Sequence, residues 1–267
     1  MLESTLSGKT PADLYNNEDL LTSTFFGLLQ YFQLSHIWED ILKESRNING
    51  KSIYDSLELE RISISGSSYI KIHFWSKFDI FGEPDLIVEI KADGSDIKLF
   101  LVIEIKLWSL KSNLGDNDQL IKYLSLLKSP VFSKKMHSPE CNNINLGVIY
   151  LTPRNSWKEI IESVNSTEQS EIARDMLYDL RWQTIYKILE KSNTKEHSFS
   201  DLQSKLMEFI LKIGLAPFDG FSVSLDVDDD ILAAYPGYLS PASFLGFTFR
   251  DVDEFQVVYN FYKGRGE

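Results

Sequence analysis

The sequence predicts an α/β fold in which a mixed β-sheet is flanked by helices, with a smaller α+β lobe at the C-terminal end. Four strand-like runs follow one another over residues 57–107, and amphipathic helical patterns precede and follow them. After a polar linker that begins near residue 191, the pattern changes to one amphipathic helix and an aromatic-rich tail. We therefore expect a core over residues 10–192 and a lobe over residues 197–267 that serves recognition or assembly.

Composition sets the broad class of the protein. The chain has 267 residues, 43% of them hydrophobic, which is enough for one large core. Its single cysteine, Cys141, excludes an internal disulfide and indicates a reducing compartment. No apolar leader follows Met1, and no apolar run is long enough to cross a bilayer. These features predict a soluble, cytoplasmic protein that does not engage a membrane.

The first helix is predicted to begin after Asn16 or Asn17, as an N-cap, and to run to about Phe32. Glu18 stands at the head of its apolar stripe, where a carboxylate is an ordinary partner of the helix dipole. A second short helix carries Trp38. We expect strands over residues 57–64 and 69–75 to follow, with His73 on the polar face of the second, either as a surface residue or within reach of a site.

A hairpin organises the middle of the chain. Its strand-like runs, residues 86–92 and 97–107, are joined by a turn centred on Gly94-Ser95, a pair that suits a two-residue loop. With that turn, Glu89 faces Phe100 and Asp85 faces Glu104. Side chains alternate along a strand, so Asp85, Glu104 and Lys106 project from one face.

This arrangement predicts metal chemistry. Directly opposed residues lie roughly 4.5–5.5 Å apart at Cβ, and two carboxylates at that distance repel unless a cation joins them. Mg²⁺ binds through one or two carboxylates and retains several waters. Lys106 would then contact a water or a phosphate beside the metal.

The hairpin holds a second Glu-x-Lys triplet, Glu89-Ile90-Lys91. Glu89 lies four residues after Asp85 on the same strand, a separation of roughly 13 Å, which is too far for the two to share one metal. The sequence therefore favours Glu104 as the metal ligand and Glu89 as a solvated residue.

A helix follows the hairpin, capped by Asp116 or Asn117 and running to Leu127. Gln119 and Tyr123 share one face of it, one turn apart. Gln119 is then either an exposed first-turn residue or a participant in the site.

At these residues the chain resembles the PD-(D/E)XK nuclease superfamily. Pro84-Asp85 and Glu104-Ile105-Lys106 match its motif, with Glu104 nineteen positions after Asp85, and Gln119 and Tyr123 match the QxxxY helix of a subset. The resemblance implies a restriction-endonuclease-like core and a Mg²⁺-dependent deoxyribonuclease, with Mn²⁺ as a substitute metal. It also implies a setting such as antiviral defence against foreign DNA.

The resemblance further implies the role of each residue. Asp85 and Glu104 bind the metal, and Glu18 becomes a candidate third ligand because the family's first helix often supplies an acidic residue. Lys106 positions or deprotonates the nucleophile and stabilises charge. Gln119 hydrogen-bonds around the active-site water or backbone, while Tyr123 supports Lys106 or a phosphate.

The charge of the chain favours a rival interpretation. A net charge of −12 is unusual for a protein that binds DNA freely, although many of the acidic residues fall in the last forty or so positions. The alternative is a catalytically silent module of the same fold that serves protein or nucleic-acid binding. The aromatic tail favours it as a surface for a protein partner or a homo-oligomer.

The remaining segments carry weaker signals. Residues 130–145 are expected to form a loop whose Lys134, Lys135 and His137 contact a DNA backbone, and His137 and Cys141 are too few for a zinc site. A strand over 146–151, an ambiguous segment over 172–180 and a helix over 182–189 should follow. The Asp226-x-Asp228-x-Asp230 run lacks the glycine of an EF-hand and predicts a solvated loop. Walker, GxSxG, HExxH and CxxC motifs are absent.

Overall fold

The computed structural model describes Ser7 and residues 17–30, 35–59, 62, 64, 69–91, 95–107, 118–192 and 197–217. The described residues belong to one compact unit that ends at Pro217. Expectations for the acidic loop and the aromatic tail lie outside them, as do Gly94, Asp116 and Asn117. No helix among the described residues is long and apolar enough to cross a membrane.

The fold is α/β, with a six-stranded mixed sheet flanked by helices, in the strand order β1-β6-β5-β4-β3-β2. The strands β4 to β6 run parallel to one another, whereas β1, β2 and β3 pair antiparallel with their neighbours. Their bounds are β1 Arg46–Asn47, β2 Tyr69–Phe74, β3 Leu86–Lys91, β4 Ile97–Ile105, β5 Asn142–Thr152 and β6 Leu177–Arg181.

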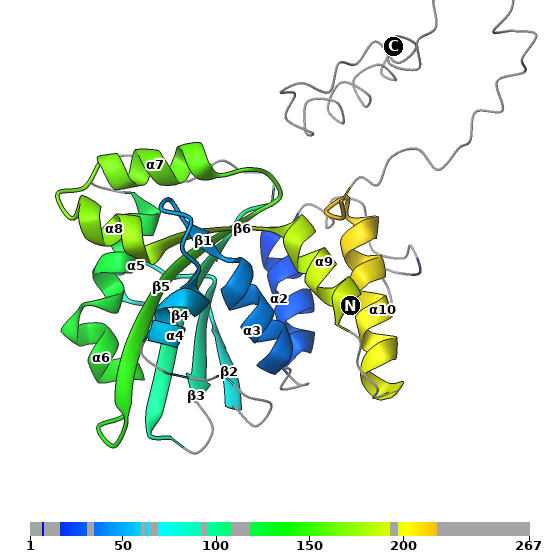
Figure 1. Ribbon diagram of the computed structural model, residues 1–267, viewed down its shortest axis with the longest axis horizontal. Coiled ribbons are helices and arrows are strands. Elements are labelled where there is room, and N and C mark those ends of the chain that lie inside the picture. Colours follow the sequence, from blue (N-terminus) through cyan, green and yellow to red (C-terminus); the bar gives the residue numbers. More distant parts are fainter. Residues whose placement is uncertain are drawn as a thin grey trace, which may run out of the picture. The chain divides into compact units, whose positions relative to one another are not determined.

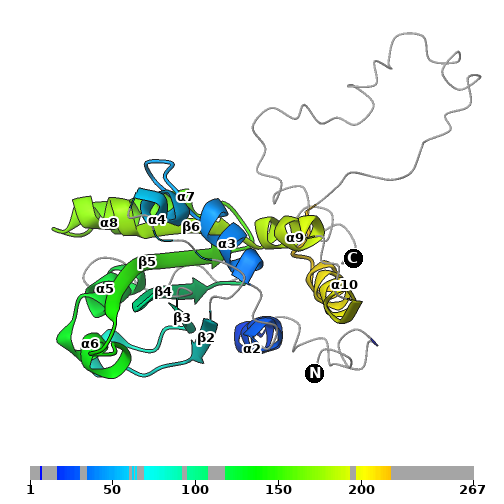
Figure 2. The ribbon, with the colours of Figure 1, turned by 60° about the horizontal axis from the view of Figure 1, so that its bottom comes forward.

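Helices cover both faces of the sheet. On one face lie α2 Glu18–Leu29, α3 Ser35–Glu44, α4 Ile53–Leu59, α9 Trp182–Lys191 and α10 His197–Lys212; on the other lie α5 Gln119–Leu127, α6 Pro130–Met136, α7 Trp157–Asn165, α8 Ser170–Met176 and the short helix η3 Asp79–Phe81. Figure 1 shows α5 and α6 on the opposite side of the sheet from α2, α9 and α10. Figure 2 shows α2 close to the edge strand β2.

Each face of the sheet has its own apolar core. Ile103 and Ile105 point into the core shared with α2, α3, α9 and α10, while Phe100 and Val102 point into the core shared with α5 and α6. Because β4 is covered on both faces, polar residues that alternate with these apolar ones are buried as well. Glu104 is one of them.

Several predicted elements are confirmed by the structure. The first helix begins at Glu18, and its N-cap Asn17 accepts a hydrogen bond from the Leu20 amide at 3.0 Å. The helix that contains Trp38, the strand over 146–151 and the helix that starts at Trp182 are all present, and both tryptophans are fully buried.

The strand expected over 57–64 is wrong at its start, because residues 53–59 form α4. Ser52 and Asp55 cap this helix reciprocally: the Ser52 amide donates to Asp55 Oδ2 at 2.7 Å, and the Asp55 amide donates to Ser52 Oγ at 3.0 Å. The Ser52-x-x-Asp55 spacing is the sequence signal for this helix, whereas the weak alternation of residues 57–64 predicts a strand.

The loop expected over 130–145 is also wrong. Ser129 caps α6 by accepting a hydrogen bond from the Phe132 amide at 3.1 Å, and Pro130 occupies the first turn, where its missing N–H costs nothing. The following strand β5 already begins at Asn142. The segment 172–180, for which the sequence leaves helix and strand open, contains one of each: the end of the helix α8 and most of the strand β6.

The C-terminal boundary of the compact unit lies further along the chain than the polar linker suggests. The helix α10, expected to open a separate lobe at 197, packs its apolar stripe into the same core as α9. That stripe consists of Leu202, Leu206, Phe209, Ile210 and Ile213.

Candidate active site

The predicted register of the hairpin is confirmed. Glu89 pairs with Phe100, and the last pair of the β3–β4 ladder is Leu86 with Ile103. One further step places Asp85 opposite Glu104. The backbone amide of Ile105 donates to Asp85 Oδ2 at 2.8 Å, which fixes the Asp85 carboxylate against the end of β4.

Glu104 is a buried carboxylate with an unsatisfied oxygen. The residue is 1% exposed, and its Oε1 lies 2.7 Å from Lys106 Nζ. Its Oε2 has no hydrogen-bond partner among the described residues. Burial, and after it the charge of Asp85, raise the pKa of Glu104 to about 8.

Asp85 experiences the same shortage of positive charge. Burial is the main cause that raises its pKa, to about 6, and the charge of Glu18 adds to the increase. The Ile105 amide and the Lys106 ammonium act in the opposite direction but do not compensate. Carboxylates with raised pKa values on neighbouring strands are typical of functional sites.

Lys106 lies between two carboxylates. Its Nζ is 2.7 Å from Glu104 Oε1 and 3.2 Å from Glu18 Oε1, and its side chain is 9% exposed. Burial alone would lower the pKa of Lys106, but Glu104, Glu18 and Asp85 together raise it above its usual value. The lysine is therefore a permanent cation at neutral pH.

Glu18 reaches this group from the start of α2. Its Oε1 accepts from Lys106 Nζ, and its Oε2 accepts from the Leu107 amide at 2.9 Å. The structure thus brings Glu18 to the site, although 88 positions separate it from Lys106. Its carboxylate is engaged by the lysine and the backbone, so its role as a third metal ligand stays a prediction.

The group of residues suits a divalent cation bound by few protein ligands. Glu18, Asp85 and Glu104 supply three carboxylates against the single ammonium of Lys106. Within the described ranges, no three His, Cys, Asp or Glu side chains form a ready metal cage. Mg²⁺ does not require such a cage, because it commonly takes one or two carboxylates and keeps its waters. The Oε2 atom of Glu104, which has no hydrogen-bond partner among the described residues, is a carboxylate oxygen that could bind such an ion.

Gln119 and Tyr123 support the turn that presents Asp85. Gln119 Nε2 donates to Tyr123 Oη at 2.9 Å, and the Tyr123 hydroxyl donates to the Glu83 carbonyl at 3.1 Å. Tyr123 is 1% exposed, and burial followed by the charge of Glu104 raises its pKa. The Tyr123 hydroxyl thus supports the Glu83 backbone, and its expected support of Lys106 or a phosphate stays a prediction. Asp118, rather than a residue before it, caps the helix.

Gln119 also carries an unsatisfied atom. Its Oε1 is buried and has no partner in the part of the chain that the structure describes. A buried amide oxygen without a partner is uncommon, and a water or a ligand atom is the usual resolution. Gln119 therefore has a free acceptor next to the tyrosine that holds the Asp85 turn.

Next to the site lies a hydrogen-bond network of Tyr150, Glu159 and Arg154, which the sequence does not predict. Tyr150 pairs with Glu104 across the β4–β5 ladder, its hydroxyl donates to Glu159 Oε2 at 2.7 Å, and Arg154 Nη2 lies 2.9 Å from Glu159 Oε1. A bulge at Gly147, whose φ of 138° favours glycine, sets the register that places Tyr150 there. No local pattern marks this network, because it joins a strand to the first turn of α7.

The second Glu-x-Lys triplet behaves differently from the first. Glu89 was expected to be solvated, but it is 8% exposed, with His73 Nε2 at 3.1 Å and Lys98 Nζ at 2.7 Å. The hydrogen bond to His73 and the contact with Lys98 outweigh burial and lower the pKa of Glu89 to about 2. The expectation failed because His73 and Lys98 come from the strands on either side of Glu89.

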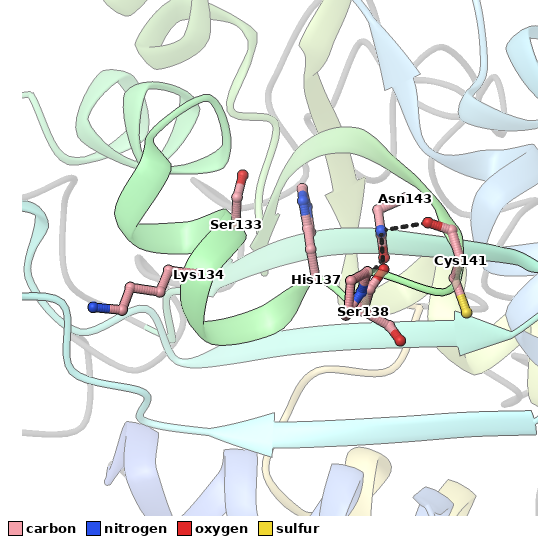
Figure 3. A pocket seen from close by; sticks show the side chains of 7 residues that line it. Ser133, Lys134, His137, Ser138, Cys141 and Asn143 are labelled. Carbon is pink, nitrogen blue, oxygen red and sulfur yellow. Dashed lines mark hydrogen bonds between the residues drawn. The ribbon is translucent and has the colours of Figure 1, made fainter.

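A pocket of about 380 Å³ lies away from these carboxylates, near the start of β5. It is lined by Ser133, Lys134, His137, Ser138, Pro139, Cys141 and Asn143 (Figure 3). Its polar groups largely satisfy one another: the Asn143 amide donates to the carbonyls of Ser138 and Cys141, and His137 contacts Asn145. The carboxylate group, and not this pocket, is therefore the candidate active site.

Compared with models of known protein families, with curated proteins and with solved structures, the chain matches none.

Proposed function

We propose that this protein is a Mg²⁺-dependent nuclease that hydrolyses phosphodiester bonds of DNA and has a restriction-endonuclease-like core. One observation carries the proposal: the half-buried Asp85 lies opposite the buried Glu104 and next to Lys106, and Glu104 Oε2 has no hydrogen-bond partner among the described residues. A structural ion pair would be satisfied within itself. In this group the raised pKa values of Asp85 and Glu104 indicate a shortage of positive charge, which a cation that replaces their protons would supply.

Asp85 and Glu104 would hold the metal, with Glu18 as the further candidate ligand. When bound, Mg²⁺ would polarise a phosphoryl oxygen and lower the pKa of a coordinated water. The Ile105 amide keeps Asp85 oriented, and the Tyr123–Glu83 hydrogen bond fixes the turn before it. The metal ligands are thus placed on rigid backbone, which is what a site needs to act without reorganising.

Lys106 is suited to stabilising charge. Because its pKa is raised, it does not readily give up its proton, and a role as general base is disfavoured. A fixed ammonium within reach of Glu104 would instead hold a phosphoryl oxygen as negative charge develops there. Of the roles that the resemblance implies for Lys106, we therefore favour positioning of the nucleophile and charge stabilisation over deprotonation.

The alternative, a catalytically silent module for binding, is favoured by one specific contact. Lys106 is held on both sides by Glu18 and Glu104, as in a structural ion-pair network. In that case the carboxylates would stabilise a binding surface and would have no use for a metal. The two proposals therefore differ in whether the group binds Mg²⁺.

The deciding experiment combines calorimetry and cleavage. The full chain and its Asp85→Asn variant are titrated with Mg²⁺ and then incubated with plasmid, single-stranded DNA and RNA. We expect the parent to bind Mg²⁺ and cut DNA, and the variant to lose both properties while still melting cooperatively. Cutting of RNA alone would change the substrate class. A parent that neither binds Mg²⁺ nor cuts any substrate would favour the silent module.

A further inference from the structure

The edge of the sheet next to the site has a polar outer face. Along β2, Ile70 and Ile72 point into the core, while Tyr69 and Lys71 point outward and are exposed and His73 is half-buried. Tyr69 keeps 53% of its surface exposed. The outward row of β2 is thus an aromatic ring followed by two basic side chains.

The same face of β3 and β4 adds two more lysines. Lys91 pairs directly with Lys98 across the hairpin, and Tyr69 pairs with Lys91 across β2 and β3. Like charges opposite each other on a ladder are destabilising unless something neutralises them. Within β2, β3 and β4 the carboxylates on this face are Glu89 and Glu104; Asp85 lies one residue before β3 and the exposed Asp96 one residue before β4.

Glu89 does not neutralise the whole group. Its two oxygens contact His73 and Lys98, which leaves Lys71 and Lys91 exposed and without an ion pair to any residue that the structure describes. Lys71 and Lys91 are diagonal neighbours, roughly 7–8 Å apart along the ladder. In a chain of net charge −12, two adjacent unpaired cations indicate an anionic partner.

The row leads to the candidate active site. Beyond the last strand residue of β2, the Trp75 amide donates to the Asp85 carbonyl at 3.1 Å. From Tyr69 to Trp75 the chain covers about 20 Å at the usual rise of a strand. Because Ile87, the partner of His73 on β3, is fully buried, the open route to the site follows the edge strand β2. A DNA strand whose scissile phosphate is held through the proposed metal at Asp85 and Glu104 would continue along that strand.

We infer that the outward face formed by Tyr69, Lys71, His73, Lys91 and Lys98 is the binding track for a single-stranded DNA segment that continues from the scissile phosphate. This inference rests on the proposed nuclease function. The lysines match a phosphate backbone, and the exposed Tyr69 ring offers a stacking surface to an unpaired base. A base within a duplex presents no such free face.

The test measures binding without cleavage. A labelled single-stranded oligonucleotide is titrated with the full chain in EDTA at several salt concentrations, followed by fluorescence anisotropy. We expect the double variant Lys71→Gln/Lys91→Gln to bind severalfold more weakly than the parent. Its negative slope of log K against log salt should be less steep by roughly 1.4, because two phosphate contacts are lost. Tyr69→Ala should weaken binding roughly fivefold or more without changing that slope.

The matched control removes two exposed lysines from the opposite side of the sheet, in Lys187→Gln/Lys191→Gln on α9. Its affinity and slope should equal those of the parent. The track is overturned if the two double variants behave alike, and the choice of occupant is overturned if duplex DNA binds more tightly than the single strand.

A separate cleavage assay with Mg²⁺ distinguishes a failure of the nuclease function from a failure of the binding track. Track-dependent binding without cleavage by the parent would retain the track and remove the nuclease function. Cleavage by the parent together with unchanged binding by Lys71→Gln/Lys91→Gln would retain the nuclease function and remove the track.

Discussion

One hairpin carries two Glu-x-Lys triplets whose glutamates lie on the same face of the sheet. Their surroundings shift the pKa values of the two carboxylates in opposite directions. Glu89 is paired with Lys98 and His73, and its pKa is lowered to about 2. Glu104 shares Lys106 with Glu18, faces Asp85 and has its pKa raised to about 8. The same triplet is therefore structural where cations suffice and a candidate site where they do not.

The largest expected difference between the two clusters is catalytic. Lys106→Met keeps the alkyl stem but removes the ammonium beside Glu104, so the cleavage rate should fall on the order of 10²–10³, as for the loss of an oxyanion-hole donor. Lys98→Met is the matched change in the other cluster. Because Lys98 belongs to the binding track, the comparison is made at saturating DNA, where Lys98→Met should cut within a few-fold of the parent rate. Equal rates for Lys106→Met and the parent would remove Lys106 from the mechanism.

The second difference is in the pH dependence of stability without metal. The pKa values of Asp85 and Glu104 are raised from 3.8 and 4.5 to about 6 and about 8, so the folded state binds more protons than the unfolded chain within that range. The stability that these two groups confer is therefore fully present below about pH 4 and decreases as the pH rises to about 8.

Thermal melts in EDTA between pH 5 and pH 8 measure this effect. As the pH rises, the titration of Asp85 and Glu104 should lower the melting temperature of the parent and of Glu89→Gln. The decrease should be smaller in Glu104→Gln. Added Mg²⁺ should raise the melting temperature most at the higher pH, because it binds the deprotonated carboxylates. A parallel pH profile for Glu104→Gln and the parent would contradict the raised pKa of Glu104.

The third difference concerns folding stability at neutral pH. Glu89→Gln removes the charged acceptor of Lys98 and His73, so unfolding free energy should fall by about 1.5–3 kcal/mol, the range for hydrogen bonds to charged groups. Because the pKa of Glu89 is lowered from 4.5 to about 2, this contribution is complete above pH 4.5 and is lost as the pH falls towards 2. Urea unfolding of the parent and the variant at pH 7 and pH 3 checks both statements, and an equal stability difference at the two pH values would contradict the second.

The smallest effect is expected for the support of the Asp85 turn. Tyr123→Phe removes the donor to the Glu83 carbonyl, and the loss should be about 1 kcal/mol of stability with less than a tenfold decrease in cleavage rate. Tyr150→Phe is a suitable comparison, because its hydroxyl binds Glu159 and leaves the turn untouched. Mg²⁺ affinity should weaken in Tyr123→Phe and remain unchanged in Tyr150→Phe. The reverse pattern would show that the Tyr123 bond does not position Asp85.

The sequence by itself determined the parts of this protein that depend on near neighbours in the chain. The turn predicted at Gly94-Ser95 and the alternation of side chains predict the β3–β4 register that the structure has, and with it the placement of Asp85 opposite Glu104. The helix caps at Asn17 and Ser129 are equally local, although the sequence pattern predicts only the first. Such features follow from backbone geometry and the spacing of a few residues.

Only the tertiary structure decided which carboxylate remains short of positive charge. His73 and Lys98 reach Glu89 from two neighbouring strands, while Glu18 reaches Lys106 from a helix 88 positions away. Periodicity tells which face a residue occupies but not which distant side chains meet it there. The pKa of a buried group depends on those partners and on desolvation, and both are properties of the packed chain.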